Sequence, residues 1–408
     1  MGHAHGANGG GAAPAAHRRL LGTIALVLGV ATLVGMVVLW PSRNVRADLG
    51  VGPSPRVYGA TVTNAESFRC NDTPTGAAGT CRRYRVELTQ GPDDGESRTI
   101  RFSDAPNVPQ LSVGDEVIVA KIRGADPGFD YSYSDRQRRS PLLWLALLFA
   151  VVVIAVGRMR GLAALAGLAA SIAVILWFML PSMLDGHSAP VVAIVSAAAI
   201  AFVVLYVTNG ITTLTTVALL ATLAALALTV VLATIFVDLA YITGAANEDA
   251  LLVQLGTATI DLKGLLLAGM VIGALGVLDD VTVTQVSAVG ELRQASPESD
   301  SRTLYRSGMR VGRDHIASTV NTLALAYAGA SLPLLILFSL ANQSLGTVAN
   351  SEAVAVAIVA TLVGSIGLVV AVPISTWLAA LVSPPVTVPS PGEARDDDEP
   401  DFWSSRKR

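Results

Sequence analysis

The sequence predicts a polytopic α-helical membrane protein with about eight transmembrane helices and a small extracytoplasmic all-β domain inserted after the first helix. Of its 408 residues, 52% are hydrophobic and only 14% are charged, whereas soluble proteins carry roughly 25% charged residues. The charges are also distributed unevenly, because positions 141–290 hold three basic and seven acidic side chains in 150 residues. Residues 42–139 differ in kind, since charged and β-branched residues alternate there between turn signals. Composition therefore argues against a water-soluble enzyme of this size.

Net charge, cysteine content and motifs narrow the possible functions further. A net charge of -3 argues against a nucleic-acid partner, which requires a basic field. Two cysteines in 408 residues exclude a disulfide-rich scaffold and a thiolate-bound cluster. The sequence contains no nucleotide-binding, HExxH or Ser/His pattern. We therefore expect no cofactor, no enzymatic activity and no primary pump within this chain.

The N-terminal part of the chain contains a tail and then one apolar run. Residues 1–19 are rich in glycine and alanine, and we expect them to form a disordered cytoplasmic tail. The apolar run Leu20–Trp40 follows two arginines and is long enough to cross a bilayer. A cleaved signal peptide is the alternative, but the run exceeds a usual signal sequence and no small-x-small cleavage site follows it. We therefore predict that residues 20–41 form an uncleaved membrane anchor.

Residues 42–139 are predicted to form the β-domain, with four or five short strands separated by turns. The strand-like segments are RVYGATVTNA, RRYRVELTQG, RTIRFSDA and GDEVIVAKIR. This number of strands in roughly 90 residues is typical of a small barrel or sandwich, and we describe the domain as OB-like. Such a shape does not by itself identify a ligand.

The two cysteines of the chain, Cys70 and Cys81, lie inside this domain and flank a ten-residue loop, NDTPTGAAGT. If the domain lies outside the cytoplasm, an oxidising compartment favours a disulfide that closes this loop. A redox or metal-binding pair is the alternative, but no histidine and no CxxC spacing accompanies the cysteines.

Between residues 140 and 383, successive apolar runs predict a seven-helix membrane domain. The expected helices are 141–157, 161–180, 189–207, 212–237, 263–289, 315–341 and 353–382. Residues 384–408 are rich in proline and then acidic, so we expect a second disordered cytoplasmic tail.

The distribution of arginines predicts the orientation of these helices. Arginines occur in the segments 158–160 and 290–313 and at the C-terminus, whereas the loops 182–188 and 239–262 contain neither lysine nor arginine. Because positive residues accumulate in cytoplasmic loops, both termini are predicted inside and the β-domain outside. Three arginines within residues 136–139 disagree with this orientation, but a folded domain is translocated largely regardless of its charge.

The sixth predicted span contains the clearest candidate site, in GMVIGALGVLDDVTVTQVSAVGEL. Asp280, Thr284, Ser287 and Glu291 follow one another at helical spacing, within about 60° of each other. A carboxylate with hydroxyl oxygens is what a cation or a transported proton needs. Asp279 points elsewhere and is the weaker candidate. The alternative is that the helix ends near Asp280 and both aspartates mark the water interface.

The seventh predicted span adds a second polar face, on which Asp314, Ser318 and Asn321 lie together. Asn321 should lie well within the bilayer, where it either binds cargo or forms an interhelical hydrogen bond. Arg310 and Arg313 could pair with acids of the preceding helix, Glu291 among them, in a gating or charge-pairing role. Equally, the two arginines could be ordinary cytoplasmic anchors. These residues indicate no particular metal.

Two of these segments carry a resemblance to a known family. GALGVLDDVTVTQVSAVGEL and GMRVGRDHIASTVNTLALAYAGASLP, separated by a short arginine-containing linker, resemble the signature of the YibE/F-like family of bacterial multi-pass membrane proteins. The β-domain, with LTQGPDDGE and SVGDEVIV, is similar to the N-terminal part of that family. The family pattern has a single aspartate after an apolar glycine-rich run. Asp280 is the position that matches this aspartate, so Asp279 looks like an extra acidic residue relative to the family pattern. The resemblance implies a bacterial inner-membrane location and leaves the activity open.

Three function classes remain. The leading interpretation is a permease or channel-like transporter for an ion or small polar solute, in which the polar faces of Asp280 and Asn321 converge on one hydrated cavity. The alternative is a non-transporting envelope assembly protein or scaffold, whose β-domain binds another envelope protein and whose polar helix faces merely pair. An intramembrane protease is disfavoured, because GALGVLDD lacks the GxGD context of such enzymes. The lipid bilayer is the expected partner, and a homo-oligomer is left open.

Overall fold

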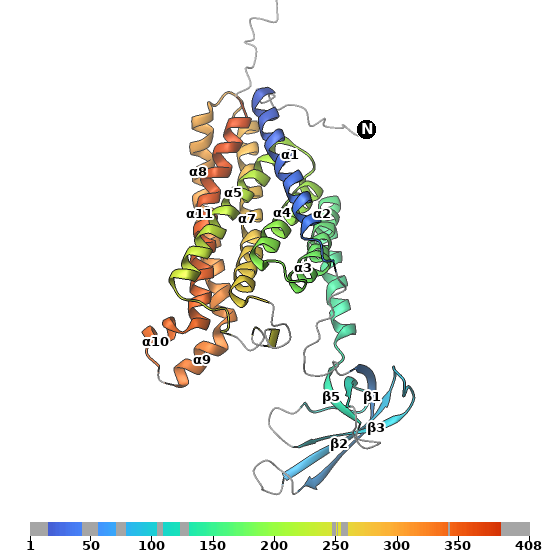
Figure 1. Cartoon of the computed structure of the whole chain (residues 1–408). Coiled ribbons are helices and arrows are strands. Elements are labelled where there is room, and N and C mark those ends of the chain that lie inside the picture. Colours follow the sequence, from blue (N-terminus) through green and yellow to red (C-terminus); the bar gives the residue numbers. More distant parts are fainter. Residues whose placement is uncertain are drawn as a thin grey trace, which may run out of the picture. The chain divides into compact units, whose positions relative to one another are not determined.

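The computed structural model describes residues 15–42, 56–70, 79–103, 109–122, 130–246, 250, 252–253, 260–341 and 343–384 (Figure 1). Most of the two expected tails, 1–14 and 385–408, lies outside the described residues, as do the loop 71–78 between the cysteines and the acidic residues Glu248 and Asp249. The chain divides into two compact units. One unit is residues 48–158, and the other combines residues 1–47 with residues 159–408.

The first unit contains one five-stranded antiparallel sheet with the order β3-β2-β1-β4-β5. Its strands are β1 (Val57–Cys70), β2 (Gly79–Leu88), β3 (Ser97–Ser103), β4 (Glu116–Lys121) and β5 (Tyr131–Arg136). Alternate apolar residues such as Val62, Val86 and Val117 are almost fully buried and form one core, because successive strand residues point to opposite faces. The sequence therefore predicted the presence of this sheet.

A charged cluster connects the turn after β2 to the strands β4 and β5. The Asp93 carboxylate accepts hydrogen bonds from Lys121 Nζ at 2.5 Å and from the Tyr131 hydroxyl at 2.6 Å. The hydrogen bond from Lys121 lowers the pKa of Asp93, because it stabilises the charged carboxylate. Burial and the bond to Asp93 raise the pKa of Tyr131 to about 12. These contacts stabilise the sheet.

The segment Arg139–Leu184 is helical on both sides of a kink at Arg158 and spans 46 residues in all. It consists of α2 (Arg139–Val174), the π-helical turn η1 (Ile175–Met179) and α3 (Leu180–Leu184). Arg158 interrupts the helix with φ 51° and ψ −128°, a conformation that costs a non-glycine residue about 1 kcal/mol or more. The boundary between the two compact units lies directly after Arg158. The sequence predicted two helices with a short loop between them, and the structure replaces that loop by one non-helical residue.

The second unit is a helical bundle built from long apolar helices (Figure 1). Its long helices are α1 (Ala15–Val38), α4 (Ala189–Asn209), α5 (Thr213–Leu239), α7 (Leu262–Ala295), α8 (Ser301–Ala330) and α11 (Glu352–Val382). Two shorter helices are α9 (Leu332–Leu340) and α10 (Leu345–Asn350). Among the described residues, six helical segments are long and apolar enough to cross a membrane. There are seven if α8 and α9, bent by 58° at their junction, form one span.

The two ends of the bundle differ in their side chains. The start of α1, the turn between α7 and α8, and the end of α11 lie at the same end of the bundle (Figure 1), where α8 begins with a series of arginines. In the connections away from that end, Asp185 accepts hydrogen bonds from Ser42, Glu352 accepts them from Thr243 and Gly244, and Lys263 pairs with Asp238. Carboxylates of these loops therefore have structural roles.

Candidate functional site

The polar residues of α7 lie on two opposite sides of the helix. Leu278, Thr282, Gln285 and Val289 are at most 2% exposed, and we call this side the inner face of α7. The opposite side, which we call the outer face of α7, is exposed throughout. Its residues are Gly269, Gly273, Gly276, Asp280, Thr284, Ser287 and Glu291.

Gln285 connects three helices from the inner face. Its Nε2 donates to the carbonyl oxygen of Gly308 on α8 and to the hydroxyl of Thr376 on α11, both at 2.8 Å. Two glycines of α8 make room for it, because a Cβ at Gly312 would lie 3.0 Å from Gln285 Oε1 and would collide with Val372. A buried amide therefore fixes the approach and register of α7, α8 and α11.

A second buried contact joins the inner face to α5. The hydroxyls of Thr282 and Thr222 lie 2.5 Å apart, and both side chains are fully buried. The Thr282 hydroxyl also lies 3.1 Å from the backbone carbonyl of Asp279. Hydroxyl and amide oxygens thus line the interior of an otherwise apolar bundle.

Asp279 lies at the margin of this inner face. It precedes Thr282 by three residues, which places their side chains within about 60° of each other. Its carboxylate Oδ1 is enclosed and has no hydrogen-bond partner among the described residues. Because buried polar oxygens in folded proteins normally have a partner, Asp279 has unused capacity to accept a proton, a cation or a donor group.

The sequence predicted that the polar residues in helical register with Asp280 form a site within the bundle, but the structure places them on its surface. Asp280, Thr284, Ser287 and Glu291 do share one side of α7, as their spacing predicted, but all four side chains are exposed on the bundle surface. The reason is packing, since bulky residues such as Leu275 and Leu278 are on the other side and are almost fully buried. The partly buried aspartate is Asp279.

The predicted polar residues of α8 are also on the surface. Asp314, Ser318 and Asn321 are exposed, as are Arg310 and Arg313. Arg310 donates to Ser307 of its own helix at 3.0 Å. In the described part of the chain, the ion pairs involve neither these residues nor the acids of α7. The expected convergence of Asp280 and Asn321 on one internal cavity is therefore not what the structure shows.

Residues missed by the sequence reasoning occupy the interior instead. Gln285, Thr282, Thr222 and Thr376 were not singled out, although a glutamine within an apolar span is a recognisable signal. The sequence places Arg293 in an arginine-rich linker. In the structure it is 6% exposed and donates to the carbonyl oxygens of Pro297 and Ser299, so it closes the turn between α7 and α8.

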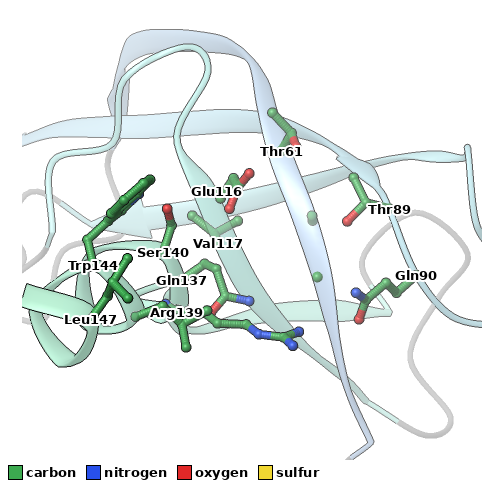
Figure 2. A pocket seen from close by; sticks show the side chains of 13 residues that line it. Thr61, Thr89, Gln90, Glu116, Val117, Gln137, Arg139, Ser140, Trp144 and Leu147 are labelled. Carbon is green, nitrogen blue, oxygen red and sulfur yellow. Dashed lines mark hydrogen bonds between the residues drawn. The ribbon is translucent and has the colours of Figure 1, made fainter. Parts of the chain in front are cut away.

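The β-unit contains a pocket of about 580 Å³ between the sheet and the first turns of α2 (Figure 2). Polar residues of the sheet and its turns, including Thr89, Gln90 and Glu116, line one part of it. Trp144 and Leu147 of α2 line another part (Figure 2). With Arg139 at the start of the helix also in the lining, the pocket presents one apolar wall and groups of both charges.

The two cysteines lie on adjacent paired strands. The backbone register pairs Phe68 with Cys81 and Cys70 with Gly79, so the two cysteines lie two residue pairs apart along the β1–β2 ladder. Cys81 is not a free thiol, whereas the side chain of Cys70 lies outside the described residues. The disulfide therefore stays a prediction. Within the described ranges, no group of three or more metal-ligating side chains is brought together.

Together these features define a class of protein, namely a bundle of membrane-length apolar helices with a few buried polar contacts, joined to a small antiparallel β-domain. The chain belongs to the YibE/F-like protein family, whose model matches residues 145–384. This match confirms the resemblance of the two motifs around Asp280 and Asn321, and it does not extend over the strands of the β-domain. No curated protein and no solved structure matches the chain.

Proposed function

We propose that the chain is a multi-pass protein of the bacterial cell membrane with both termini in the cytoplasm. The apolar helices and the family support a membrane location. The arginines at the start of α8 lie at the end of the bundle where α1 begins and α11 ends, which supports a cytoplasmic assignment of that end. Reporter fusions at Asp94 and Ser299 should report opposite sides, with Asp94 outside. If both reporters were found on the same side of the membrane, this topology would be wrong.

The β-domain is proposed to lie outside and to be OB-like. The strand order β3-β2-β1-β4-β5 is that of a five-stranded OB barrel opened between β3 and β5. In that compartment Cys70 and Cys81 would form a disulfide, and closing a loop of this length stabilises by roughly 3 kcal/mol. Thiol labelling of denatured, non-reduced protein should be negative, and quantitative labelling of both cysteines would contradict the pairing.

The function that the geometry supports best is a permease or channel-like transporter for a proton, another small cation or a small polar solute. The observation that carries it is the enclosed, unpartnered Oδ1 of Asp279 beside the polar inner face of α7. Asp279 is the 18th residue of α7, or roughly 25 Å from its start, which corresponds to the inner third of a bilayer. An ionisable group at such depth is costly and usually serves an ion or proton pathway.

The inner face supplies a donor set suited to this cargo. A carboxylate followed by the Thr222–Thr282 hydroxyl pair and the Gln285 amide offers oxygens at successive levels of α7. Hard oxygen donors suit a proton or a hard cation. In this proposal Asp279 is the group that alternately holds and releases the cargo, and it undergoes no covalent chemistry.

Flux through proteoliposomes tests the proposal. Vesicles with an internal pH-sensitive dye would report H⁺ entry under an imposed potential, and Na⁺ and K⁺ would be measured in parallel. Asp279→Asn should reduce the flux to that of protein-free vesicles while the protein stays inserted, and Asp280→Asn should reduce it less. If Asp279→Asn retained the flux and Asp280→Asn lost it, the transport site would lie at Asp280 on the outer face of α7 instead. If the wild-type protein carried none of the three cations, the proposal of a cation permease would be wrong.

A second candidate function is a non-transporting envelope assembly protein or scaffold that acts through its β-domain. The pocket of Figure 2 favours it, because an apolar wall beside polar and charged groups suits part of an amphipathic partner. In this case Trp144→Ser should abolish complementation of a deletion strain, and Asp279→Asn should be tolerated at equal membrane abundance. The opposite pattern would support transport.

A further inference from the structure

The outer face of α7 has the composition of a helix–helix interface, and among the described residues only the Tyr327 side chain of α8 approaches its glycines, at Gly273. Glycines at positions 269, 273 and 276 continue directly into Asp280, Thr284, Ser287 and Glu291. A Cβ placed at Gly269 or Gly276 would meet no atom within 4 Å, so no other helix packs there. Small residues that permit close approach, combined with polar side chains, are typical of helix contacts within membranes.

A complementary set of charges lies on α8. Arg302, Arg306 and Arg313 are exposed and recur at spacings of four and seven residues, which places them within about 40° of each other on the helix. We call them the arginine stripe of α8. Helix α8 flanks the outer face of α7, because the Tyr327 hydroxyl lies 3.8 Å from a Cβ placed at Gly273. The described chain contains no ion pair between the stripe and the acids of α7.

The acids of α7 and the arginines of α8 lie at matching levels along the bundle. The contact of Gln285 with the Gly308 carbonyl sets the antiparallel register of the two helices. Asp280 is five residues before Gln285, and Arg313 is five residues after Gly308. Glu291 is six residues after Gln285, and Arg302 is six residues before Gly308. At 1.5 Å per residue, each acid therefore lies level with one arginine.

We propose that a second copy of this chain covers this surface, through a two-fold axis along the membrane normal. Such an axis preserves the level of every residue, so the outer face of α7 meets the arginine stripe of the second copy in register. Asp280 then pairs with Arg313 of the second copy, and Glu291 pairs with Arg302, each contact being formed twice because a two-fold interface is isologous. The glycines allow the close approach.

The physical reason is the cost of leaving Asp280 where it is. It lies at the same depth as Asp279, and a charged carboxylate facing lipid there is unfavourable unless it is paired. Pairing with an arginine of a second copy removes that cost, whereas pairing within the chain is not formed in this structure. The inference rests on the proposed membrane placement of α7 and α8, and it is independent of whether Asp279 transports anything.

A charge exchange between two differently tagged copies tests the dimer. In Asp280→Arg alone, the interface places arginine against arginine twice, and in Arg313→Asp alone it places aspartate against aspartate twice. In a mixed dimer of the two variants, both contacts are again between opposite charges. Co-purification from membranes should therefore be strong for wild type with wild type, lost for each variant with itself, and restored for the mixed pair.

The controls keep the outcomes distinct. Arg310→Asp changes an exposed arginine that is turned about 60° from Arg313 around α8, and with Asp280→Arg it should not restore association. Equal membrane insertion and unfolding temperature of the variants show that each copy is folded. Wild-type copies that do not co-purify overturn the proposal. It is also overturned if the mixed pair fails while Asp280→Arg and Arg313→Asp in one chain restore wild-type behaviour, because that result indicates pairing within the chain.

Discussion

The polar side chains on the two faces of α7 differ in burial and in whether they have partners. On the inner face, Thr282 and Gln285 are fully enclosed, and each has a side-chain partner on a neighbouring helix. On the outer face, Asp280 and Glu291 are exposed and form no ion pair in the described chain. The first arrangement fixes the geometry of one bundle. The second provides groups that a partner can still satisfy.

The difference teaches that bulk, more than polarity, determines which face turns inward. The inner face combines its polar residues with leucines and valines that fill the core, such as Leu278 and Val289. The outer face combines its polar residues with glycines that bury almost no apolar area. Burial of large apolar side chains is worth roughly 1.5–3 kcal/mol each, so the leucine-bearing side packs against the bundle and the glycine-bearing side remains open.

The largest effect is expected from crowding the inner face. A Cβ at Gly312 collides with Val372 and approaches Gln285, so Gly312→Ala should destabilise the bundle by about 3 kcal/mol, as overpacked cores do. Unfolding in mixed detergent micelles measures this loss. Gly329→Ala on the same helix is the control, because its Cβ meets no atom within 4 Å. Equal destabilisation by both variants would show that α8 does not pack as described.

Much of the architecture was predictable because long apolar runs and alternating strands are strong local patterns. The anchor at 20–41, the helices from 189 onward and the β-domain correspond to elements in the structure. The orientation of α7 was not predictable in the same way. Asp279 and Asp280 differ by only 100° around the helix, and the choice between them depends on how Gly308 and Gly312 of α8 receive Gln285. That complementarity joins residues far apart in the sequence.

Two breaks in the helices also could not be predicted in detail from the sequence. Arginines near residue 158 indicated a loop, but the chain remains helical on both sides of Arg158. The expected span 315–341 begins earlier, at Ser301, and bends by 58° after Ala330. The sequence signalled an interruption near residue 158, whereas the bend after Ala330 was not predicted.

A smaller effect is expected from filling the outer face. Gly276→Leu introduces bulk where nothing lies within 4 Å, so the stability of one bundle should be unchanged. Association of two copies should weaken by about tenfold, or roughly 1.4 kcal/mol, because the close approach is lost. Energy transfer between labelled copies in vesicles measures this change as the protein is diluted with lipid.

Gly22→Leu provides the matched control, since Gly22 of α1 is equally open and is not part of the outer face. Equal loss of energy transfer in both variants would place the dimer contact elsewhere. Loss of bundle stability in Gly276→Leu would instead show that the outer face is already covered within one chain.

The smallest effect compares two threonines two residues apart. Thr282 lies 2.5 Å from Thr222 in the interior, whereas Thr284 is exposed on the outer face. Thr282→Val keeps the shape but removes an interhelical hydrogen bond, which in membrane proteins is worth on average about 0.6 kcal/mol. Its bundle should therefore unfold at a slightly lower detergent fraction, while Thr284→Val should match wild type. A double cycle with Thr222→Val isolates the pairwise energy, because Thr282→Val should cost little once Thr222 is absent. If Thr284→Val were the more damaging of the two, the assignment of inner and outer faces on α7 would have to be reversed.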